Sequence, residues 1–558
     1  MKKNQPLFLA WTFLTILLLY SWYRISALTG GHFCYSLDDA FIHMAVAKNL
    51  GLHGVWGITP DAFGSASSSP LYTILLASLF CIGVNSYLAG LWINILAAYG
   101  VLFTVHSILL KYALPAIGRT IVLLSLIILF PFTVIILTGM EHLLHFWFAL
   151  LFIQGIVEMI SADNINGRKL LLVSCWGALM VATRFEGLFI LGAACLLLLF
   201  YKKIIAAFTT GFVAALPVVI FAIISVAYGG YILPNSVLLK SSGGPAGPGA
   251  LSHALQEILI YRLMYGNSTI MGLFQADKAY TGQSSISGTS LLRILIIVPL
   301  LVVLVKTKLS GNTTKQAVNM GIILSIGGAL HLALAAVGWM FRYEAYLIGL
   351  AIINIGLLLW CLWPGITSLY AGSVWPQRLV MVLLLFFVAS PLLARAMAGY
   401  RSTYRACRNI YDQQVQMGRF LQQYYPGVPV AANDVGAVSF LSESRIVDIW
   451  GLGNNEIARS KLTGHYSAEY LKKLLKREKV KIAVMYPDWY EASLYQNWAE
   501  TGSWTIQDNV VCADPTVRFF ALDSADAPAL KRNLEAFQAQ LPGSVNVGYG
   551  VYKKMAEK

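Results

Sequence analysis

Long apolar segments constrain the fold of this chain more than any other feature of its sequence. A helix that crosses a bilayer takes about 20 apolar residues, and fewer where neighbouring helices bury it. Charged residues make up only 12% of the chain, about half the share in a soluble domain. The sequence therefore predicts a polytopic α-helical membrane protein with about eleven transmembrane helices. We place these helices near 7–27, 87–110, 120–138, 142–160, 170–183, 187–201, 204–228, 291–306, 318–340, 345–363 and 378–397.

One shorter apolar run, residues 70–84, decides the topology. Lys and Arg concentrate in cytoplasmic loops of membrane proteins. If the run does not cross and the N-terminus is inside, the predicted cytoplasmic segments hold 12 Lys and Arg in 50 residues, against 6 in 116 outside. If the run crosses, this bias reverses in the later loops. We therefore predict a juxtamembrane helix within a first outer loop at 28–86, a location in the cytoplasmic (inner) membrane, and an N-terminus inside.

The net charge of +14 has the same explanation. A basic balance in a membrane protein marks its cytoplasmic loops, so we expect no nucleic-acid partner. Membrane lipids are the surroundings that the apolar surface requires.

The last part of the chain changes character and predicts a separate domain. Apolar strands are expected at 428–432, 445–449 and 481–486, with a helix capped by Ser467 before the third. This alternation predicts a soluble α/β domain at 399–558, outside the membrane, after a transmembrane domain at 1–398. Cys407 and Cys512 both fall in this outer part; the sequence leaves open whether they form a disulfide.

Five groups of polar residues fall in segments predicted to lie on the outer side, and Asp38-Asp39 is the first. A helix is expected to begin at this pair, because Asp suits a helix N-terminus and the next residues are largely apolar. Adjacent carboxylates can activate a hydroxyl or hold a divalent metal such as Mg or Mn. The alternative is structural, with one Asp capping the helix and the other solvated.

The other four groups lie in turns between predicted helices. Their members are Gly139-Met140-Glu141 with His142, Arg184 and Glu186 between two short helices, Tyr228 to Ser236 with Asn235 and the following Lys240, and Arg342-Tyr343-Glu344. Each group alone fits a helix cap, a structural ion pair or a snorkelling side chain. Together they place three cations at one membrane surface, which is what a phosphate at the headgroup level requires.

Short motifs in this order resemble a known family. They are Asp38-Asp39-Ala40-Phe41-Ile42, Ser69-Pro70-Leu71-Tyr72, Gly139-Met140-Glu141, Thr183-Arg184-Phe185-Glu186-Gly187, Leu233-Pro234-Asn235 with Lys240, and Arg342-Tyr343. The pattern resembles the GT-C fold glycosyltransferases that use polyprenyl-phosphate sugars, most closely the mycobacterial arabinofuranosyltransferases that add terminal residues. The resemblance continues at 432–437 and 447–452, and so covers nearly the whole chain. Two positions depart from it: Phe185 stands where the family usually has Pro, and Gly230 where it often has an acidic residue.

This resemblance implies a reaction. The donor would be a sugar on a polyprenyl phosphate, and the acceptor a hydroxyl of a cell-envelope glycan or glycolipid. Asp38 would be the general base, and Asp39 would support it or share a divalent metal with it. The remaining roles would be donor-phosphate binding by Arg342, Lys240 and Arg184, and orientation or support of the sugar, the acceptor and these cations by Glu141, Glu186, Asn235 and His142.

Two other functions remain compatible with the residues themselves. A transporter or flippase for a lipid-linked or anionic substrate also places charges at helix breaks, although usually near the bilayer midplane and within an inverted repeat. A non-catalytic scaffold would use its C-terminal domain to bind a partner. The absence of a repeat between the two halves and the placement of the charges at one surface favour the glycosyltransferase.

Overall fold

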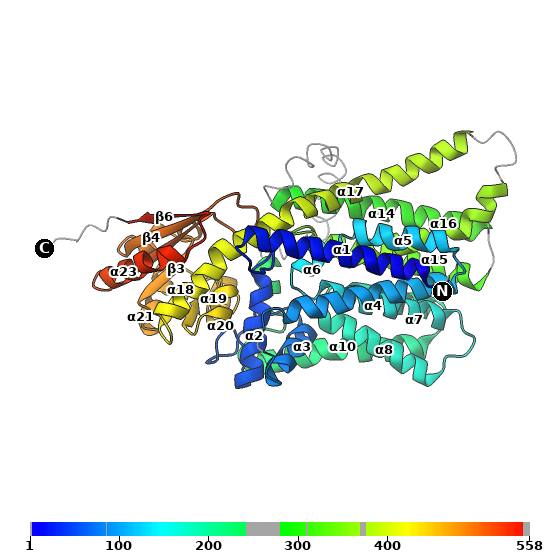
Figure 1. Cartoon of the computed structure of the whole chain (residues 1–558). Coiled ribbons are helices and arrows are strands. Elements are labelled where there is room, and N and C mark those ends of the chain that lie inside the picture. The colour runs from blue at the N-terminus through cyan, green and yellow to red at the C-terminus, as the bar shows by residue number, and fades with distance from the viewer. Residues whose placement is uncertain (1–2, 85, 242–279, 309–310, 369–374, 551–558) are drawn as a thin grey trace.

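The computed structural model describes residues 3–84, 86–241, 280–308, 311–368 and 375–550. A long bundle of helices forms one end of the molecule and a sheet with flanking helices forms the other (Figure 1). The first helix begins at the end of the bundle that is farther from the sheet. The start of α1 and the C-terminal sheet therefore lie at opposite ends of an elongated molecule.

The helices of the bundle follow the apolar segments. They are α1 (Gln5–Leu28), α4 (Ala89–Lys111), α5 (Ala116–Leu129), α6 (Phe132–Leu137), α7 (His142–Ile160), α8 (Gly167–Thr183), α9 (Gly187–Phe200), α10 (Ile204–Ala227), α14 (Tyr280–Lys308), α15 (Asn312–Leu334), α16 (Ala345–Ser368) and α17 (Trp375–Ile410). Three shorter helices, α2 (Asp39–His53), α3 (Pro70–Cys81) and α11 (Asn235–Ser241), lie in the connections.

Seven helices in the described residues are long and apolar enough to cross a membrane. The protein is therefore a multi-pass membrane protein, while the count of eleven spans stays a prediction. The span predicted at 120–138 is divided into α5 and α6 around Pro131, because proline lacks the N–H that would continue the helix. The predicted pair of short helices is present: α8 has 17 residues and α9 has 14.

The run at 70–84 forms α3, a helix of 12 residues. This is shorter than the roughly 20 residues of a bilayer crossing, in agreement with the predicted juxtamembrane helix. Helix α3 packs against α2, and α2 lies across the end of the bundle, between it and the C-terminal domain (Figure 1). The first outer loop therefore forms a layer between the two parts of the molecule.

A continuous helical path joins the membrane helices to the C-terminal domain. Helix α17 has 36 residues and passes into a π-helical turn (Tyr411–Val415) and then α18 (Gln416–Tyr424). The predicted boundary at 398/399 thus falls inside α17 rather than in a linker.

The C-terminal domain contains one six-stranded sheet in the order β2-β1-β3-β5-β4-β6. The strands β1 (Pro429–Ala432), β2 (Arg445–Asp448) and β3 (Ile482–Met485) are parallel and match the predicted strands. The sequence did not reveal the antiparallel strands β4 (Ala499–Ile506), β5 (Thr516–Ala521) and β6 (Val545–Tyr549). The domain's helices are α19 (Ala437–Leu441), α20 (Asn455–Leu462), α21 (Ala468–Arg477), α22 (Ala492–Tyr495) and α23 (Ala527–Phe537).

Alternation along the strands gives the sheet two buried faces. Ala431 and Ala483 pack with Leu471 of α21 on one face. Phe519 and Trp504 pack on the other face, against Phe420 of α18 and Phe537 of α23. The capping of α21 by Ser467 is confirmed, because its hydroxyl accepts the Tyr470 N–H at 3.2 Å. The α/β domain is therefore a helix–sheet–helix sandwich.

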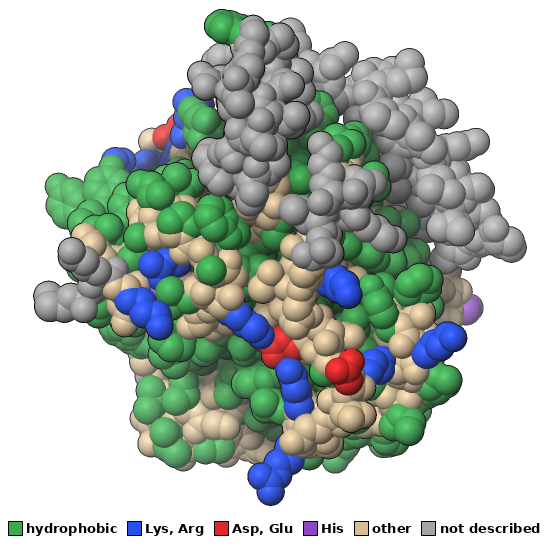
Figure 2. All heavy atoms as spheres, turned by 90° about the vertical axis from the view of Figure 1, so that its right-hand side faces the viewer, with side chains coloured by type: hydrophobic (Ala, Val, Ile, Leu, Met, Phe, Trp, Pro, Cys, Tyr) green, Lys and Arg blue, Asp and Glu red, His purple; other side chains and the backbone are tan. Residues whose placement is uncertain are grey.

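Figure 2 shows the end of the bundle that is farther from the C-terminal domain. Lys and Arg side chains gather across this face, with few acidic side chains among them. Cationic loops mark the cytoplasmic side of a membrane protein. The predicted orientation would put this face in the cytoplasm and the C-terminal domain on the outer side, and it stays a prediction.

Trp504 supplies a test of the sandwich. Its side chain is fully buried, 4.5 Å from Phe519 and 5.7 Å from Phe537 between ring centroids. We expect Trp504→Ala to lower the free energy of unfolding of the C-terminal domain by about 3–5 kcal/mol, measured by urea-dependent pulse proteolysis of the full chain. The control Trp504→Phe keeps an aromatic ring and should cost clearly less; equal losses would contradict this packing.

Candidate functional site

The two adjacent aspartates of the first loop point to different partners. Asp39 begins α2 and Asp38 occupies the N-cap position, which confirms the predicted helix start. The Asp38 carboxylate makes no capping hydrogen bond and is directed to the C-terminal domain, whereas the Asp39 carboxylate forms an ion pair with Arg342 of the membrane domain. The pair thus divides its contacts between the two halves of the molecule.

Asp38 holds the start of α19. Its two carboxylate oxygens accept the N–H groups of Gly436 at 2.7 Å and Ala437 at 2.8 Å. A Cβ atom added to Gly436 would overlap the backbone oxygen and the carboxylate of Asp38, so this close approach requires glycine. Asp38 therefore fastens the first outer loop to the C-terminal domain.

A second carboxyl group, from the half-buried Asp434, lies beside Asp38. Asp434 is hydrogen-bonded to Asp38 and accepts hydrogen bonds from Gln414 Nε2 at 2.8 Å and the Tyr486 hydroxyl at 3.3 Å. Burial, followed by repulsion from Asp434, raises the pKa of Asp38 well above its ordinary value. Burial likewise raises the pKa of Asp434. Two carboxyl groups in contact, here one buried and one half-buried, favour sharing one proton.

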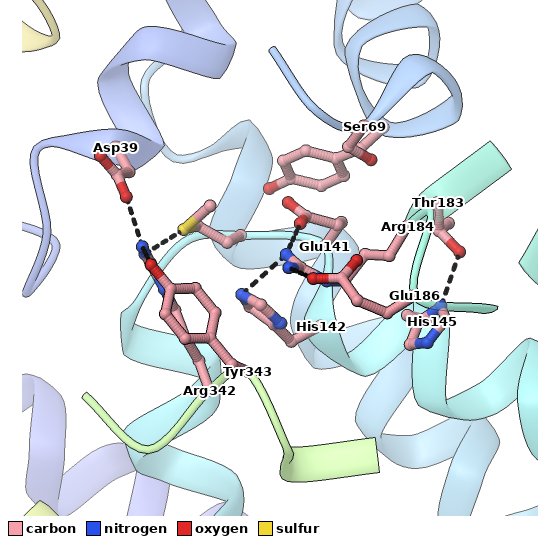
Figure 3. A network of polar contacts seen from close by, with 12 residues as sticks. Asp39, Ser69, Glu141, His142, His145, Thr183, Arg184, Glu186, Arg342 and Tyr343 are labelled. Atoms are coloured by element: carbon pink, nitrogen blue, oxygen red, sulfur yellow. Dashed lines mark hydrogen bonds and ion pairs between the residues drawn. The ribbon is translucent and has the colours of Figure 1, made fainter. Parts of the chain in front are cut away.

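Asp39 and Arg342 form the adjacent contact, in the left part of Figure 3. The Asp39 side chain is 24% exposed, whereas that of Arg342 is only 1% exposed. The same guanidinium contacts the Met140 sulfur at 2.6 Å and the Tyr343 hydroxyl at 3.4 Å. Its Nε has no hydrogen-bond partner among the described residues. Because a thioether is a weak acceptor, this buried guanidinium keeps unused donor capacity.

The loop that carries Arg342 is held rigidly. Three consecutive residues before it, Trp339, Met340 and Phe341, have φ values of 41°, 53° and 58°, a left-handed conformation that L-residues avoid. Buried Glu344 accepts the Gly338 N–H at 2.9 Å and pairs with Arg395 Nε of α17 at 2.9 Å. Arg395 also donates to the Phe341 carbonyl. These contacts fix the backbone on both sides of Arg342.

A second buried network surrounds Arg184, in the centre of Figure 3. Arg184 Nη1 lies 2.5 Å from Glu141 Oε1, and Nη2 pairs with Glu186. Although burial favours the neutral form, the Arg184 guanidinium lowers the pKa of Glu186 to about 2. His142 Nε2 lies 3.5 Å from Arg184, and His43 Nε2 lies 3.5 Å from Glu141. The predicted Arg184–Glu186 pairing is present, with Glu141 as a further partner.

The fourth polar group lies against the C-terminal domain. Asn235 Nδ2 donates to Asn455 Oδ1 at 2.8 Å, and the Asn235 backbone N–H donates to the Ser65 carbonyl at 3.0 Å. Asn235 thus joins the turn after α10 to the first outer loop and to α20. Lys240 belongs to α11, but its side chain lies outside the described residues, so its predicted phosphate contact stays a prediction.

The partners of Asp38 and Asp39 bear on whether these carboxylates could bind the predicted metal ion. The described residues hold no group of three or more His, Cys, Asp or Glu side chains that could bind a metal ion. Asp38 faces two N–H groups and Asp39 faces a guanidinium, which are positive partners rather than an arrangement that suits a cation. Mg or Mn binding by this pair therefore stays a prediction without support from the geometry.

The structure answers the question about the two outer cysteines. Both Cys407 and Cys512 are buried free thiols, so the disulfide between them does not form here. The Cys512 thiol donates instead to Gln414 Oε1 at 3.3 Å. Cys512 thus contacts the same glutamine that donates to Asp434.

Several residues of these networks were not identified as site residues from the sequence. Arg395 carried the clearest signal, because an ionisable group inside an apolar helix usually has a specific partner. His43 follows Asp39 by one helical turn and therefore shares its face of α2. Asp434 lies in a segment that contributed to the family resemblance, but nothing in that segment indicated a contact with Asp38.

The Asp38–Asp434 pair predicts a pH-dependent stability. A carboxyl group whose pKa is raised by folding contributes stability below its ordinary pKa of about 4 and loses it as the pH rises through the raised value. Asp434→Asn carries a permanent N–H donor toward Asp38. We expect this variant to show a higher Tm than the unmodified chain at about pH 9 and a similar Tm at about pH 5, measured in detergent. If the Tm of the unmodified chain and the Tm of Asp434→Asn changed with pH in the same way, a proton shared by Asp38 and Asp434 would be contradicted.

The Arg395–Glu344 pair predicts a loss that can be partly rescued. Arg395→Leu leaves a buried carboxylate without its cation, which typically costs about 3–5 kcal/mol. The double variant Arg395→Leu with Glu344→Leu removes both charges and should regain much of this stability. In this double variant Arg342 should remain displaced, because the Gly338 N–H and the Phe341 carbonyl still lack the partners that Glu344 and Arg395 supply. Thermal unfolding measures the first effect and backbone hydrogen exchange at residues 338–342 the second; full recovery of both would refute the positioning role.

Comparison with known proteins gives one matching family model, described as a domain of unknown function (DUF8728), over residues 408–520. This range covers the C-terminal domain from the end of α17 to β5. No curated protein matches the sequence.

Comparison with solved structures found chains with a similar arrangement. The crystal structure of ArnT from Cupriavidus metallidurans in the apo state is 13% identical with a TM-score of 0.49, covering 92% of this chain and 98% of that one. The crystal structure of the Archaeoglobus fulgidus oligosaccharyltransferase is 12% identical with a TM-score of 0.47, and the match covers 95% of this chain and 74% of that one. A mutant of arabinofuranosyltransferase AftD from Mycobacteria is 11% identical with a TM-score of 0.44, and the match covers 92% of this chain and 42% of that one. Likeness at these identities and TM-scores assigns no residue or reaction to this chain.

Proposed function

We propose that this chain is a membrane glycosyltransferase of the GT-C type. It transfers a sugar from a polyprenyl-phosphate donor to a hydroxyl of a cell-envelope glycan or glycolipid, on the side of the membrane that carries the C-terminal domain. The proposal rests on the residues Asp38-Asp39, Arg184 and Arg342, which resemble the motifs of that family, and on the geometry of the two carboxylate–guanidinium networks.

The incomplete bonding of Arg342 carries this proposal. A guanidinium has five N–H donors, and those of Arg342 meet one carboxylate, one hydroxyl at 3.4 Å and one thioether, with Nε unpaired in the described part of the chain. A phosphate oxygen is a far stronger acceptor than a thioether and suits the planar fork of arginine. A donor phosphate would therefore compete with Asp39 for Arg342.

This competition would release the base. With the phosphate on Arg342, the partly exposed Asp39 carboxylate would exchange this guanidinium for the acceptor hydroxyl. Asp38 was the base that the family resemblance implied, but both of its oxygens already accept backbone N–H groups. We therefore propose Asp39 as the base and Asp38 as the residue that holds the C-terminal domain against it.

The proposed reaction balances without a further reactant. Asp39 takes the proton of the acceptor hydroxyl, whose oxygen forms a bond to the anomeric carbon. The bond from that carbon to the phosphate oxygen breaks, and its electron pair leaves with the polyprenyl monophosphate. Arg342 stabilises the charge that develops on this leaving group. General-base catalysis contributes about 10²–10⁴-fold, and preorganised charge at the leaving group often contributes more.

The Arg184 network suits a supporting role. Its guanidinium already lies between two carboxylates, Glu141 and Glu186, so it offers less free charge to a phosphate than Arg342 does. Together with His142, these carboxylates supply acceptors for sugar hydroxyls beside the reacting carbon. Asn235 would act indirectly, because it fixes the turn after α10 to the C-terminal domain.

Asp39→Asn provides a test with two opposite effects. The asparagine cannot accept the proton, so we expect the transfer rate to fall by about 10²–10⁴-fold. The same change removes the carboxylate that competes for Arg342, so polyprenyl phosphate should bind more tightly. The measurements are mass spectrometry of products from a panel of polyprenyl-phosphate sugars, including arabinofuranose, and binding of unglycosylated polyprenyl phosphate in detergent.

Matched variants separate chemistry from folding. Arg342→Gln should weaken phosphate binding, and Asp434→Asn should leave transfer largely intact. Asp38→Asn removes an acceptor for the C-terminal domain and should lower the Tm together with activity. Unchanged transfer in Asp39→Asn, or weaker phosphate binding by that variant, would refute the mechanism. Movement of intact lipid-linked sugar across vesicles without transfer would instead favour the flippase.

A further inference from the structure

A polar cavity lies at the end of the bundle opposite the C-terminal domain, on the face seen in Figure 2. Its volume is about 230 Å³. The end of α7 and the residues after it line one side, the connection from α9 to α10 a second side, and the first turns of α15 a third. No residue of the networks around Arg184 or Arg342 lines it.

Positive and donor groups dominate the lining of this cavity. Lys203 and Lys315 both contribute, and Lys203 Nζ is fixed by the carbonyls of Ala162 and Asp163, each at 2.9 Å. Asp163 is the one acidic residue of the lining. Helices α10 and α15 both begin here, and neither shows a side-chain cap. Their first N–H groups add partial positive charge.

One buried donor in the lining lacks a partner. Asn319 is 1% exposed and its Oδ1 accepts the Tyr201 hydroxyl at 3.0 Å. Its Nδ2 has no hydrogen-bond partner in the part of the chain that the structure describes. A buried unpaired amide is costly, and an acceptor in the adjoining cavity would remove this cost. The lining therefore suits an anion.

A second cavity lies on the neighbouring turns of α9 and α10. It has a volume of about 280 Å³ and is lined by α9 and α10, at Cys195, Leu199, Ala207, Phe208, Gly211 and Phe212. Lys203, Ala207 and Gly211 follow each other at intervals of four residues and so lie on one stripe of α10. The apolar groove thus begins one helical turn beyond the lysine of the polar cavity.

We propose that the two cavities together bind one anionic phospholipid. The phosphate of its headgroup lies among Lys203, Lys315 and Asn319, and an acyl chain lies in the α9–α10 groove. A free phosphate would use only the first cavity, and a zwitterionic lipid would bring a cation into a basic site. In the predicted orientation this lipid belongs to the cytoplasmic leaflet, whose anionic headgroups favour basic pockets between transmembrane helices.

The test compares ligands that share either the tails or the headgroup. Delipidated full-length protein in detergent is titrated with phosphatidylglycerol, with phosphatidylcholine of the same acyl chains, and with glycerol phosphate, and binding is followed by native mass spectrometry. We expect phosphatidylglycerol to bind most tightly. Lys203→Gln with Lys315→Gln should weaken its binding by about 30-fold, since each lysine near an anionic headgroup contributes about 1 kcal/mol.

Two further variants keep the test decisive if the double variant folds poorly. Lys315→Gln alone changes an exposed side chain and should weaken binding by about 5-fold. Gly211→Leu places a side chain into the groove, where a Cβ meets only the Cys195 sulfur at 3.5 Å. This variant should weaken the binding of both lipids and leave the binding of glycerol phosphate unchanged.

The control variant removes two lysines from the same end of the bundle. Lys111 and Lys169 pair with Glu158 and line neither cavity. The double variant Lys111→Gln with Lys169→Gln should therefore bind phosphatidylglycerol as tightly as the unmodified chain does. Equal weakening by this control would overturn the site, as would equal binding of the two lipids. Glycerol phosphate binding as tightly as the lipid would overturn the assignment of a lipid.

Discussion

The structure depends on two adjacent carboxylates at the start of α2. Successive residues of a helix point in directions about 100° apart, so Asp38 and Asp39 cannot face the same partner. Asp38 accepts the N–H groups at the start of α19 in the C-terminal domain, and Asp39 pairs with Arg342 between α15 and α16. One turn of backbone thereby links the first outer loop, the membrane helices and the C-terminal domain.

Buried charges of this kind rarely stabilise a fold by themselves, because desolvation offsets their attraction. Here they are arranged around a backbone that would not otherwise keep its shape. Glu344 and Arg395, both fully buried, hold three consecutive left-handed residues next to Arg342. Strain that is held by buried ion pairs usually marks a site that must keep its geometry. The held backbone keeps Arg342 in place although its guanidinium is incompletely hydrogen-bonded to the described residues.

Much of the architecture follows from local sequence patterns. Apolar runs located the long helices, Ser467 located the start of α21, and the distribution of Lys and Arg indicated that residues 70–84 form a helix inside the outer loop. The break at Pro131 and the continuous α17 were missed, because hydropathy alone does not distinguish a broken helix from a straight one. Strands β4 to β6 were also missed; β4 and β6 contain Gly502 and Gly548, and glycine is depleted in strands.

The sequence predicted which residues belong to the site, but it did not predict which residues they contact. Arg184, Glu186, Glu141, Arg342 and the aspartates stood out because charges at a membrane surface need partners. No spacing indicated that Asp38 would meet Gly436, a residue 398 positions away, or that Asp434 would share its environment. The resemblance to a family assigned the base to the first aspartate, whereas the contacts favour the second. Such a distinction depends on the three-dimensional path of the chain.

The most direct test of the central claim is a structure of the chain with polyprenyl phosphate bound. Our account predicts that the phosphate contacts Arg342, that the ion pair between Arg342 and Asp39 is broken, and that the contact of Asp38 with Gly436 is retained. A bound phosphate that leaves the Asp39–Arg342 pair intact and lies elsewhere would contradict it.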